Sequence, residues 1–328
     1  MRSFLNGPAF VGLLCLIVLA LLPLVIESTY IRHLIIVALI YGMVASSWDL
    51  SLGYAGVFNF AHLAFFGLGV YGTAVFAKTL EISSWIAIPM GGIVAVFAAF
   101  LVALPVLRLK GIYVILVTFA SSQLFLQLVL SQSDITGGSA GMVLLPPLEI
   151  SDYNFARDGK LAYYYVALAL FVAMAVLLRR LVRSNFGVSI VALRDDEDYG
   201  VSRGVSVARQ RFLTMVASAL VAGIAGGFYA IYLRVASPEV FGFPLMTLTL
   251  SMLLLGGAGS LFGPMVAAFV LTFLSEWMQE LGQWRFLIIA SAIILTIHFY
   301  PGGIISALTL LYDKLVRLLG QSGKARRE

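Results

Sequence analysis

The sequence predicts an all-α polytopic membrane protein with roughly ten transmembrane helices, some of them broken or re-entrant. The first observation is composition: 61% of the 328 residues are hydrophobic and 11% are charged, whereas a soluble domain carries about 25% charged residues. The second is a series of apolar runs, most of them near the roughly 20 residues that one helical crossing needs. The third is that these runs do not alternate apolar and polar residues, as the strands of a membrane barrel would.

Ten apolar runs predict the individual crossings, since a helix satisfies every backbone amide within its own segment. The first run follows Met1 and Arg2 and resembles a secretory signal, but its length and the lack of a small-x-small cleavage site predict a retained helix. The eighth run is short for a full crossing. The runs lie near Ala9–Ile26, His33–Leu50, Phe58–Ala77, Trp85–Leu107, Ile112–Leu130, Leu161–Leu178, Phe212–Leu233, Leu245–Gly256, Pro264–Met278 and Phe286–Tyr300.

The distribution of lysine and arginine predicts the orientation, because these residues collect in cytoplasmic loops. If ten helices alternate, the basic residues near both ends of the chain and in the segment 183–211 fall on one side of the membrane, so both termini are expected in the cytoplasm. The loop 133–160 falls on the extracytoplasmic side, and residues 312–328 form a cytoplasmic tail. We expect one transmembrane domain over residues 1–328.

Several function classes find no support in the sequence. No basic run is interleaved with aromatic residues, which argues against a nucleic-acid partner. The single cysteine, Cys15, forms no internal disulfide, and no spacing of His, Cys and acidic residues is typical of a metal site. Neither a catalytic arrangement nor a Walker A loop is present in the sequence. We therefore expect no catalytic residue, metal or cofactor, and energy that comes from another subunit or from an ion gradient.

One hydrophilic stretch, ALRDDEDYGVSRGVS, interrupts the apolar sequence between the sixth and seventh runs. Gly187 can turn the chain out of the membrane, Asp195 or Asp196 can cap a second short helix, and Gly204 can end it. These signals predict a short amphipathic helix pair on the cytoplasmic face. The alternatives are a solvated loop or an interfacial helix on lipid. The clustered acids argue against an anionic lipid surface and favour a protein partner with basic residues.

Two glycine-rich stretches, Leu52–Thr73 and Leu255–Pro264, interrupt apolar runs in the two halves of the chain. Paired interruptions are typical of broken helices around a transport pathway, although small residues also serve close helix packing. Gly223 and Gly227 fit the packing interpretation better. The pathway candidates are Gly53, Gly56, Asn59, His62, Gly256, Gly257 and Gly259.

Two ionisable residues near these stretches have open roles. His62 either lines the pathway or donates a structural hydrogen bond between helices. Asp49 lies near a membrane boundary and needs a partner, because a buried carboxylate is costly in lipid. It is also a candidate proton or sodium site.

The order of several motifs resembles one known family. The segments SLGYAGVFNFAHLAFFGLGVYG, GIYVILVTFA, TGGSAG, LLLGGAGSLFGP and FYPGG, together with the long segment from Phe186, resemble permease subunits of ABC importers for branched-chain amino acids, of the LivM and LivH type. The resemblance covers roughly Leu39 to Ile304. It implies a type II-like ABC importer permease in the bacterial plasma (inner) membrane. The implied partners are a second homologous permease subunit, two cytoplasmic ATPase subunits and an extracytoplasmic solute-binding protein.

The resemblance also gives the hydrophilic stretch a role as the element that docks on the ATPase subunit. The implied coupling residues are Ala192, Leu193, Arg194, Asp195, Asp196, Glu197 and Gly204. The sequence departs from the family pattern at Asp198, Tyr199 and Gly200. Glycine costs about 1 kcal/mol of helix propensity relative to alanine, which weakens the prediction of a second short helix.

These observations predict a non-catalytic permease subunit that forms half of the pathway for a small polar solute, with branched-chain or related amino acids as the expected class. Related permeases also handle urea, amides and aromatic acids, so the resemblance leaves the substrate open. The alternative is an ion-gradient-driven secondary transporter that uses Asp49 or His62 for ion coupling. The stretch from Ala192 favours the first hypothesis, because a gradient-driven carrier needs no ATPase dock.

Overall fold

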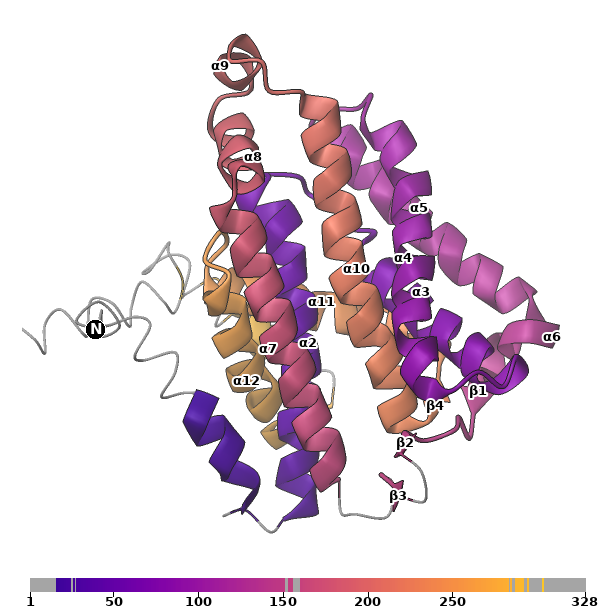
Figure 1. Cartoon of the computed structure of the whole chain (residues 1–328). Helices are drawn as coiled ribbons and strands as arrows, with labels where there is room; N and C mark the ends of the chain where they lie inside the picture. The colour runs from indigo at the N-terminus through magenta and orange to yellow at the C-terminus, as the bar shows by residue number, and fades with distance from the viewer. Residues whose placement is uncertain are drawn as a thin grey trace, which may run out of the picture.

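The computed structural model describes residues 16–24, 26, 28–150, 153–155, 160–282, 284, 287–291, 294 and 303. Within these residues the protein is almost entirely helical, and Figure 1 shows its long helices running alongside one another as a bundle. The predicted all-helical class is confirmed. Cys15, the tail 312–328 and most of the last predicted crossing lie outside the described residues.

Five helices in the described part are long and apolar enough to cross a membrane. The first begins as α2 and continues into a π-helical turn, η1, so that it spans Thr29–Tyr54. The five are α2 (Thr29–Asp49) with η1 (Leu50–Tyr54), α4 (Ser84–Val106), α5 (Ile112–Ser131), α7 (Leu161–Arg183) and α10 (Val207–Leu233). All five coincide with predicted apolar runs.

Shorter apolar helices occupy three further predicted runs. Helix α3 (His62–Ala74) continues into the π-helical η2 (Val75–Thr79), and α11 (Phe243–Gly256) and α12 (Phe262–Trp277) follow α10. The third run was predicted from Phe58, but residues 55–61 are not helical and helix α3 begins at His62. Residues 16–24 are helical within the first predicted run.

The core forms where α3, α4 and α10 pack against one another at glycines. A Cβ atom at Gly69 would overlap the carbonyl oxygen of Gly223, and one at Gly223 would overlap Ala95. A Cβ atom at Gly227 would overlap the hydroxyl of Thr73. The predicted packing role of Gly223 and Gly227 is therefore confirmed.

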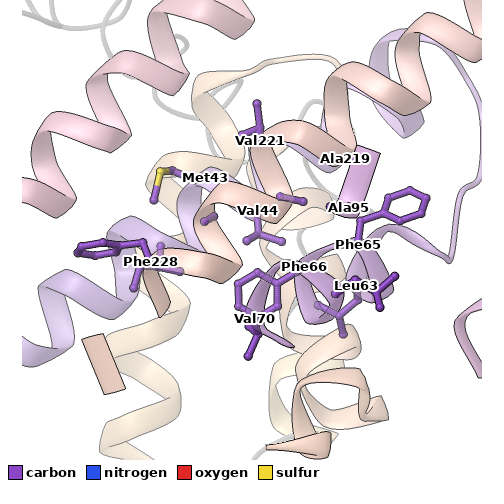
Figure 2. Close-up of a cluster of buried hydrophobic side chains, with 14 of the residues drawn as sticks. Met43, Val44, Leu63, Phe65, Phe66, Val70, Ala95, Ala219, Val221 and Phe228 are labelled. Atoms are coloured by element: carbon purple, nitrogen blue, oxygen red, sulfur yellow. The ribbon is translucent and has the colours of Figure 1, made fainter. Parts of the chain in front are cut away.

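Large side chains fill the space around these glycine contacts. Figure 2 shows this cluster, which joins side chains of α2, α3, α4 and α10. Its labelled members are Met43, Val44, Leu63, Phe65, Phe66, Val70, Ala95, Ala219, Val221 and Phe228.

Short strands and turns close the end of the bundle that lies away from α9 (Figure 1). Two antiparallel pairs, which the all-α prediction did not include, link β1 to β4 and β2 to β3. Arg234 donates from Nε to the carbonyl of Leu145 at 2.7 Å, and Lys78 donates to the carbonyl of Val143 at 2.6 Å. These contacts fix the loop 133–160 to the bundle. The elements here are α6 (Ser133–Thr136), η3 (Gly138–Ala140), β1 (Met142–Val143), β2 (Glu149–Ile150), β3 (Tyr153–Asn154), β4 (Val235–Ala236), η4 (Pro238–Phe241) and η5 (Gln279–Leu281).

Two short helices form the opposite end of the molecule. Helices α8 (Asn185–Asp195) and α9 (Glu197–Ser202) connect α7 to α10, and α9 lies farthest from the bundle in Figure 1. A Cβ atom at Gly187 would overlap the carbonyl of Val182, so glycine is required where α8 turns away from α7. The predicted short helix pair is confirmed as a structural feature.

We predict that Gly69→Ala lowers the stability of the purified protein by about 1–3 kcal/mol, because the new methyl group meets the backbone of Gly223 rather than a movable side chain. Thermal unfolding in detergent measures the effect. Gly72→Ala on the same helix is the matched control, since its Cβ would meet side-chain atoms of Val94 at 3.1 Å. Equal midpoints for the two variants would contradict the packing argument.

Candidate functional site

The second short helix, α9, forms despite the glycine at its centre. The side chain of Asp196 caps it by accepting a hydrogen bond from the Tyr199 amide at 2.9 Å, and Gly204 follows it with a φ of +83°. Gly200 is buried, and a Cβ atom there would lie 2.7 Å from Cδ2 of Leu193. The glycine therefore lets α9 pack closely on α8, and this contact offsets its low helix propensity.

Glu197 holds α9 to the rest of the protein through two cations. Its carboxylate accepts from Nζ of Lys110 at 2.7 Å and from the guanidinium of Arg211 at 3.0 Å. Lys110 lies in the connection between α4 and α5, and Arg211 lies on α10. The hydrogen bond from Lys110, together with the charge of Arg211, lowers the pKa of Glu197 below its ordinary value.

Arg194 connects α8 to the first glycine-rich stretch. Its Nη1 atom donates to the carbonyl of Gly53 at 2.7 Å, while Nε and Nη2 donate to a carboxylate oxygen of Asp195 at 2.9 and 2.7 Å. A Cβ atom at Gly56 would lie 2.8 Å from Cγ of Arg194, so glycine at that position gives the arginine chain its room. The family resemblance predicted that Arg194 contacts an ATPase subunit. The structure shows a contact of Arg194 with Gly53 of the same chain.

The first glycine-rich stretch contains a true break in the helix. The chain is helical to Tyr54, non-helical over residues 55–61 and helical again from His62. Gly56 has a φ of +67°, a conformation that favours glycine. The amide of Phe60 donates to Oγ1 of Thr118 at 3.1 Å, which ties the break to α5.

The second stretch breaks between α11 and α12 and is held by Asp49. Residues 257–261 separate the two helices, and Gly257 and Gly259 have φ values of +98° and +80°. Asp49 is fully buried at the end of α2. Its Oδ1 accepts from the Gly259 amide at 2.7 Å, and its Oδ2 accepts from the Leu261 amide at 3.1 Å. Both carboxylate oxygens therefore bind backbone donors, an arrangement that does not favour a cation site.

His62 makes structural contacts of the kind that the sequence left as an alternative. It is fully buried, and its Nε2 lies 3.1 Å from Oγ of Ser47 and 3.2 Å from the carbonyl of Val44. The ring stacks on Trp48 with centroids 5.5 Å apart. A ring that donates from Nε2 joins α3 to α2, which supports the structural role.

The other pathway candidates do not all lie together; most of them contact different neighbours. Asn59 is buried and accepts a hydrogen bond from the Ala61 amide at 3.0 Å, within the first break itself. Gly256 packs on Gly263, and Gly257 lies against Gly303. Of the seven candidates, the structure brings Gly53 into direct contact with Gly259, because a Cβ atom at Gly53 would overlap the Gly259 amide.

A polar face on α5 was not predicted from the sequence. Gln123 and Gln127 are exposed in the middle of a span, one helical turn apart. Amide side chains are costly to expose to lipid. The signal that could have found them is this pair of glutamines inside an otherwise apolar run. The two glutamines lie on an exposed stripe of the helix with Tyr113, Leu116, Ala120 and Ser131, and apolar residues such as Leu124 and Leu128 are exposed beside it.

Comparison with known proteins identifies the family. Residues 30–298 match the family described as branched-chain amino acid transport system / permease component. The chain belongs to this family. The predicted resemblance is confirmed, and with it the prediction of a non-catalytic, multi-pass membrane protein of a bacterial ABC permease family.

Individual relatives support the same assignment. The chain is 28% identical over 288 residues to the high-affinity branched-chain amino acid transport system permease protein LivM of Salmonella typhimurium (strain LT2), with 81% of this chain and 68% of LivM covered. LivM of Escherichia coli (strain K12) gives the same identity and coverage. LivH of Salmonella typhimurium is 25% identical over 248 residues, which cover 70% of this chain and 79% of LivH. No solved structure gives a significant match.

We predict that Glu197→Gln loosens α9, because it removes both ion pairs. Partly exposed pairs contribute about 0–1 kcal/mol, so exchange of the α9 amides should accelerate by at most roughly fivefold. Hydrogen–deuterium exchange measures this. A lowered folded-state pKa means that the contribution is complete at neutral pH and is lost as the pH falls below the ordinary value of 4.5. Asp198→Asn, the neighbouring exposed acid, is the control; equal acceleration in both variants would count against the ion pairs.

Proposed function

We propose that this chain is the membrane-spanning subunit of an ATP-driven importer and forms half of a pathway for branched-chain or related amino acids. The single observation that carries the coupling part of this proposal is the contact of Arg194 with the Gly53 carbonyl, which connects the protruding α8–α9 pair to a broken membrane helix. A dock for an ATPase needs such a connection, because a loop that moved independently would transmit no force to the membrane helices.

The proposal includes a topology and a set of partners. One domain over residues 1–328 crosses the bacterial plasma membrane about ten times, with broken helices, and both termini are cytoplasmic. A second homologous permease, two cytoplasmic ATPase subunits and an extracytoplasmic solute-binding protein complete the assembly. The segment 183–211 faces the cytoplasm, and the loop 133–160 faces the opposite side, in agreement with their positions at opposite ends of the bundle (Figure 1).

The surface of α9 supports docking of an ATPase subunit. Tyr199 and Val201 are 54% and 51% exposed at the tip of the molecule, and exposed acids adjoin them at Asp195 and Asp198. Arg203 donates to the hydroxyl of Tyr199 at 3.0 Å, so Val201 and the acids remain the groups that fit a groove with an apolar floor and a basic rim. The proposed coupling residues remain Ala192, Leu193, Arg194, Asp195, Asp196, Glu197 and Gly204.

The polar face of α5 supports a pathway for a zwitterionic solute. Gln123 and Gln127 each offer an amide donor and acceptor for the charged ends of an amino acid, and Leu116 offers apolar surface for an aliphatic side chain. A second permease subunit that presents the same kind of face would enclose the solute between the two chains. Gly53, which precedes the first break, and Gly259, which lies in the second, remain proposed parts of the pathway wall.

We predict that Val201→Asp reduces co-purification of the ATPase subunits by at least tenfold, because it places a charge in the proposed apolar contact. The experiment isolates the full transporter after co-expression and compares the subunit ratios. Val143→Asp is the matched control: this valine is 49% exposed at the opposite end of the protein. ATPase binding that survives Val201→Asp, or is lost equally in both variants, would overturn the proposed dock.

We predict that the double variant Gln123→Leu with Gln127→Leu reduces leucine uptake into proteoliposomes by at least tenfold while the subunits still assemble. The reason is the loss of the amide groups on the exposed face of α5, with the apolar character of the span retained. Leu128→Ala, at an exposed apolar position of the same helix, serves as control and should transport normally. Normal uptake by the glutamine variant would exclude this face from the pathway.

A further inference from the structure

The carboxylate of Asp49 acts as a cap for a helix in another part of the chain. Helix α12 begins at Phe262, and the amides of Gly259 and Leu261 directly precede its first turn. These two amides lie in the break and have no hydrogen-bond partner in either flanking helix, and a carboxylate is a favourable acceptor near the positive end of the helix dipole. The cap comes from α2, so it joins the two halves of the protein.

Gly53 lies between this cap and the short helix α8. A Cβ atom at Gly53 would overlap both Oδ1 of Asp49 and the amide of Gly259, so the backbone of Gly53 is in direct contact with the Asp49–Gly259 hydrogen bond. On its other side, the Gly53 carbonyl accepts from Nη1 of Arg194 at 2.7 Å. A Cβ atom at Gly259 would lie 3.5 Å from the same Nη1 atom. Arg194, Gly53, Asp49 and Gly259 therefore form one continuous set of contacts.

The helices on the far side of this set pack on α2 and partly on the main core, to which Met246 and Leu253 of α11 belong. Buried side chains of α11 and α12 form a small hydrophobic cluster with Ala45 of α2, distinct from the main core. Arg179 of α7 also lies over the ring of Phe262, with 5.7 Å between the guanidinium carbon and the ring centroid. The first turn of α12 is thus in contact with the segment that leads into α8, and a movement of α8 reaches it through short, charge-assisted contacts.

We infer that Asp49 is a positioning residue of the transport cycle: it transmits movement of the α8–α9 pair, through Arg194 and Gly53, to the start of α12 at the second helix break. This inference rests on the proposed function, because it requires an ATPase that moves α8. When the carboxylate holds the Gly259 and Leu261 amides, α12 follows α8. When the carboxylate is lost, the ATPase still docks and hydrolyses ATP, but the second break no longer follows.

The test measures ATP hydrolysed per leucine transported by the complete transporter in proteoliposomes. Asp49→Asn keeps the size of the side chain but replaces one acceptor oxygen with an amide donor that faces a backbone donor. We expect assembly and ATP hydrolysis within twofold of the unmodified transporter, and uptake of labelled leucine at least tenfold lower. The ATP-to-leucine ratio therefore rises at least fivefold. Arg194→Leu, which removes the contact with the Gly53 carbonyl, should also lower leucine uptake at least tenfold, and uptake by the double variant should be little lower than by either single variant.

Thr272→Val is the matched control, because Thr272 is a buried residue of α12 whose hydroxyl has no hydrogen-bond partner among the described residues. Its ratio should stay unchanged. Asp49→Asn with an unchanged ratio overturns the inference, as does an equal fall in hydrolysis and uptake, which would indicate a defect in ATPase docking. Because the unmodified transporter is assayed in parallel, ATP-dependent uptake there leaves the proposed function standing when the inference fails. An unmodified assembly without ATP-dependent uptake would overturn both.

Discussion

An interrupted helix in hydrocarbon leaves backbone amides that lipid cannot hydrogen-bond. This constraint determines how the two helix breaks are built. Within the residues that the structure describes, two such breaks lie at 55–61 and 257–261, and each receives a hydrogen-bond acceptor from another helix. Thr118 of α5 accepts from Phe60 in the first break, and Asp49 of α2 accepts from Gly259 and Leu261 in the second. Burial of the Asp49 carboxylate would cost free energy if it were unpaired, but these hydrogen bonds offset the cost.

The glycines serve two different physical needs. In α3, α4 and α10 they allow backbones to approach so closely that any side chain would overlap a neighbouring carbonyl, as at Gly69. In the two breaks, residues such as Gly56 and Gly257 adopt a positive φ that changes the direction of the chain. The packing glycines bring the helices of the bundle close together, and the glycines with positive φ allow the chain to turn within the breaks.

Hydropathy was sufficient to predict the five long helices, because an apolar run of sufficient length has one stable backbone arrangement in lipid. Local signals also predicted that Asp195 or Asp196 could cap α9, of which Asp196 does, and that Gly204 could end it. The sequence could not show that Gly200 packs on Leu193, that Gly69 packs on Gly223, or that Arg194 contacts Gly53, because each contact depends on three-dimensional packing. The pairing of β1 with β4 was invisible for the same reason.

The small size of α9 bears on how a docked ATPase subunit, in the proposed assembly, would move the membrane helices. A helix of six residues is too short to be stable by itself, and partly exposed ion pairs such as those of Glu197 contribute little. Its stability in this chain therefore comes from close packing on α8 and from the Asp196 cap. Helix α8 is longer, is packed against the bundle and carries Arg194 to a break in a membrane helix. In the proposed assembly, α9 would therefore provide a surface for recognition of the ATPase subunit, and α8 would be the element through which movement reaches the bundle.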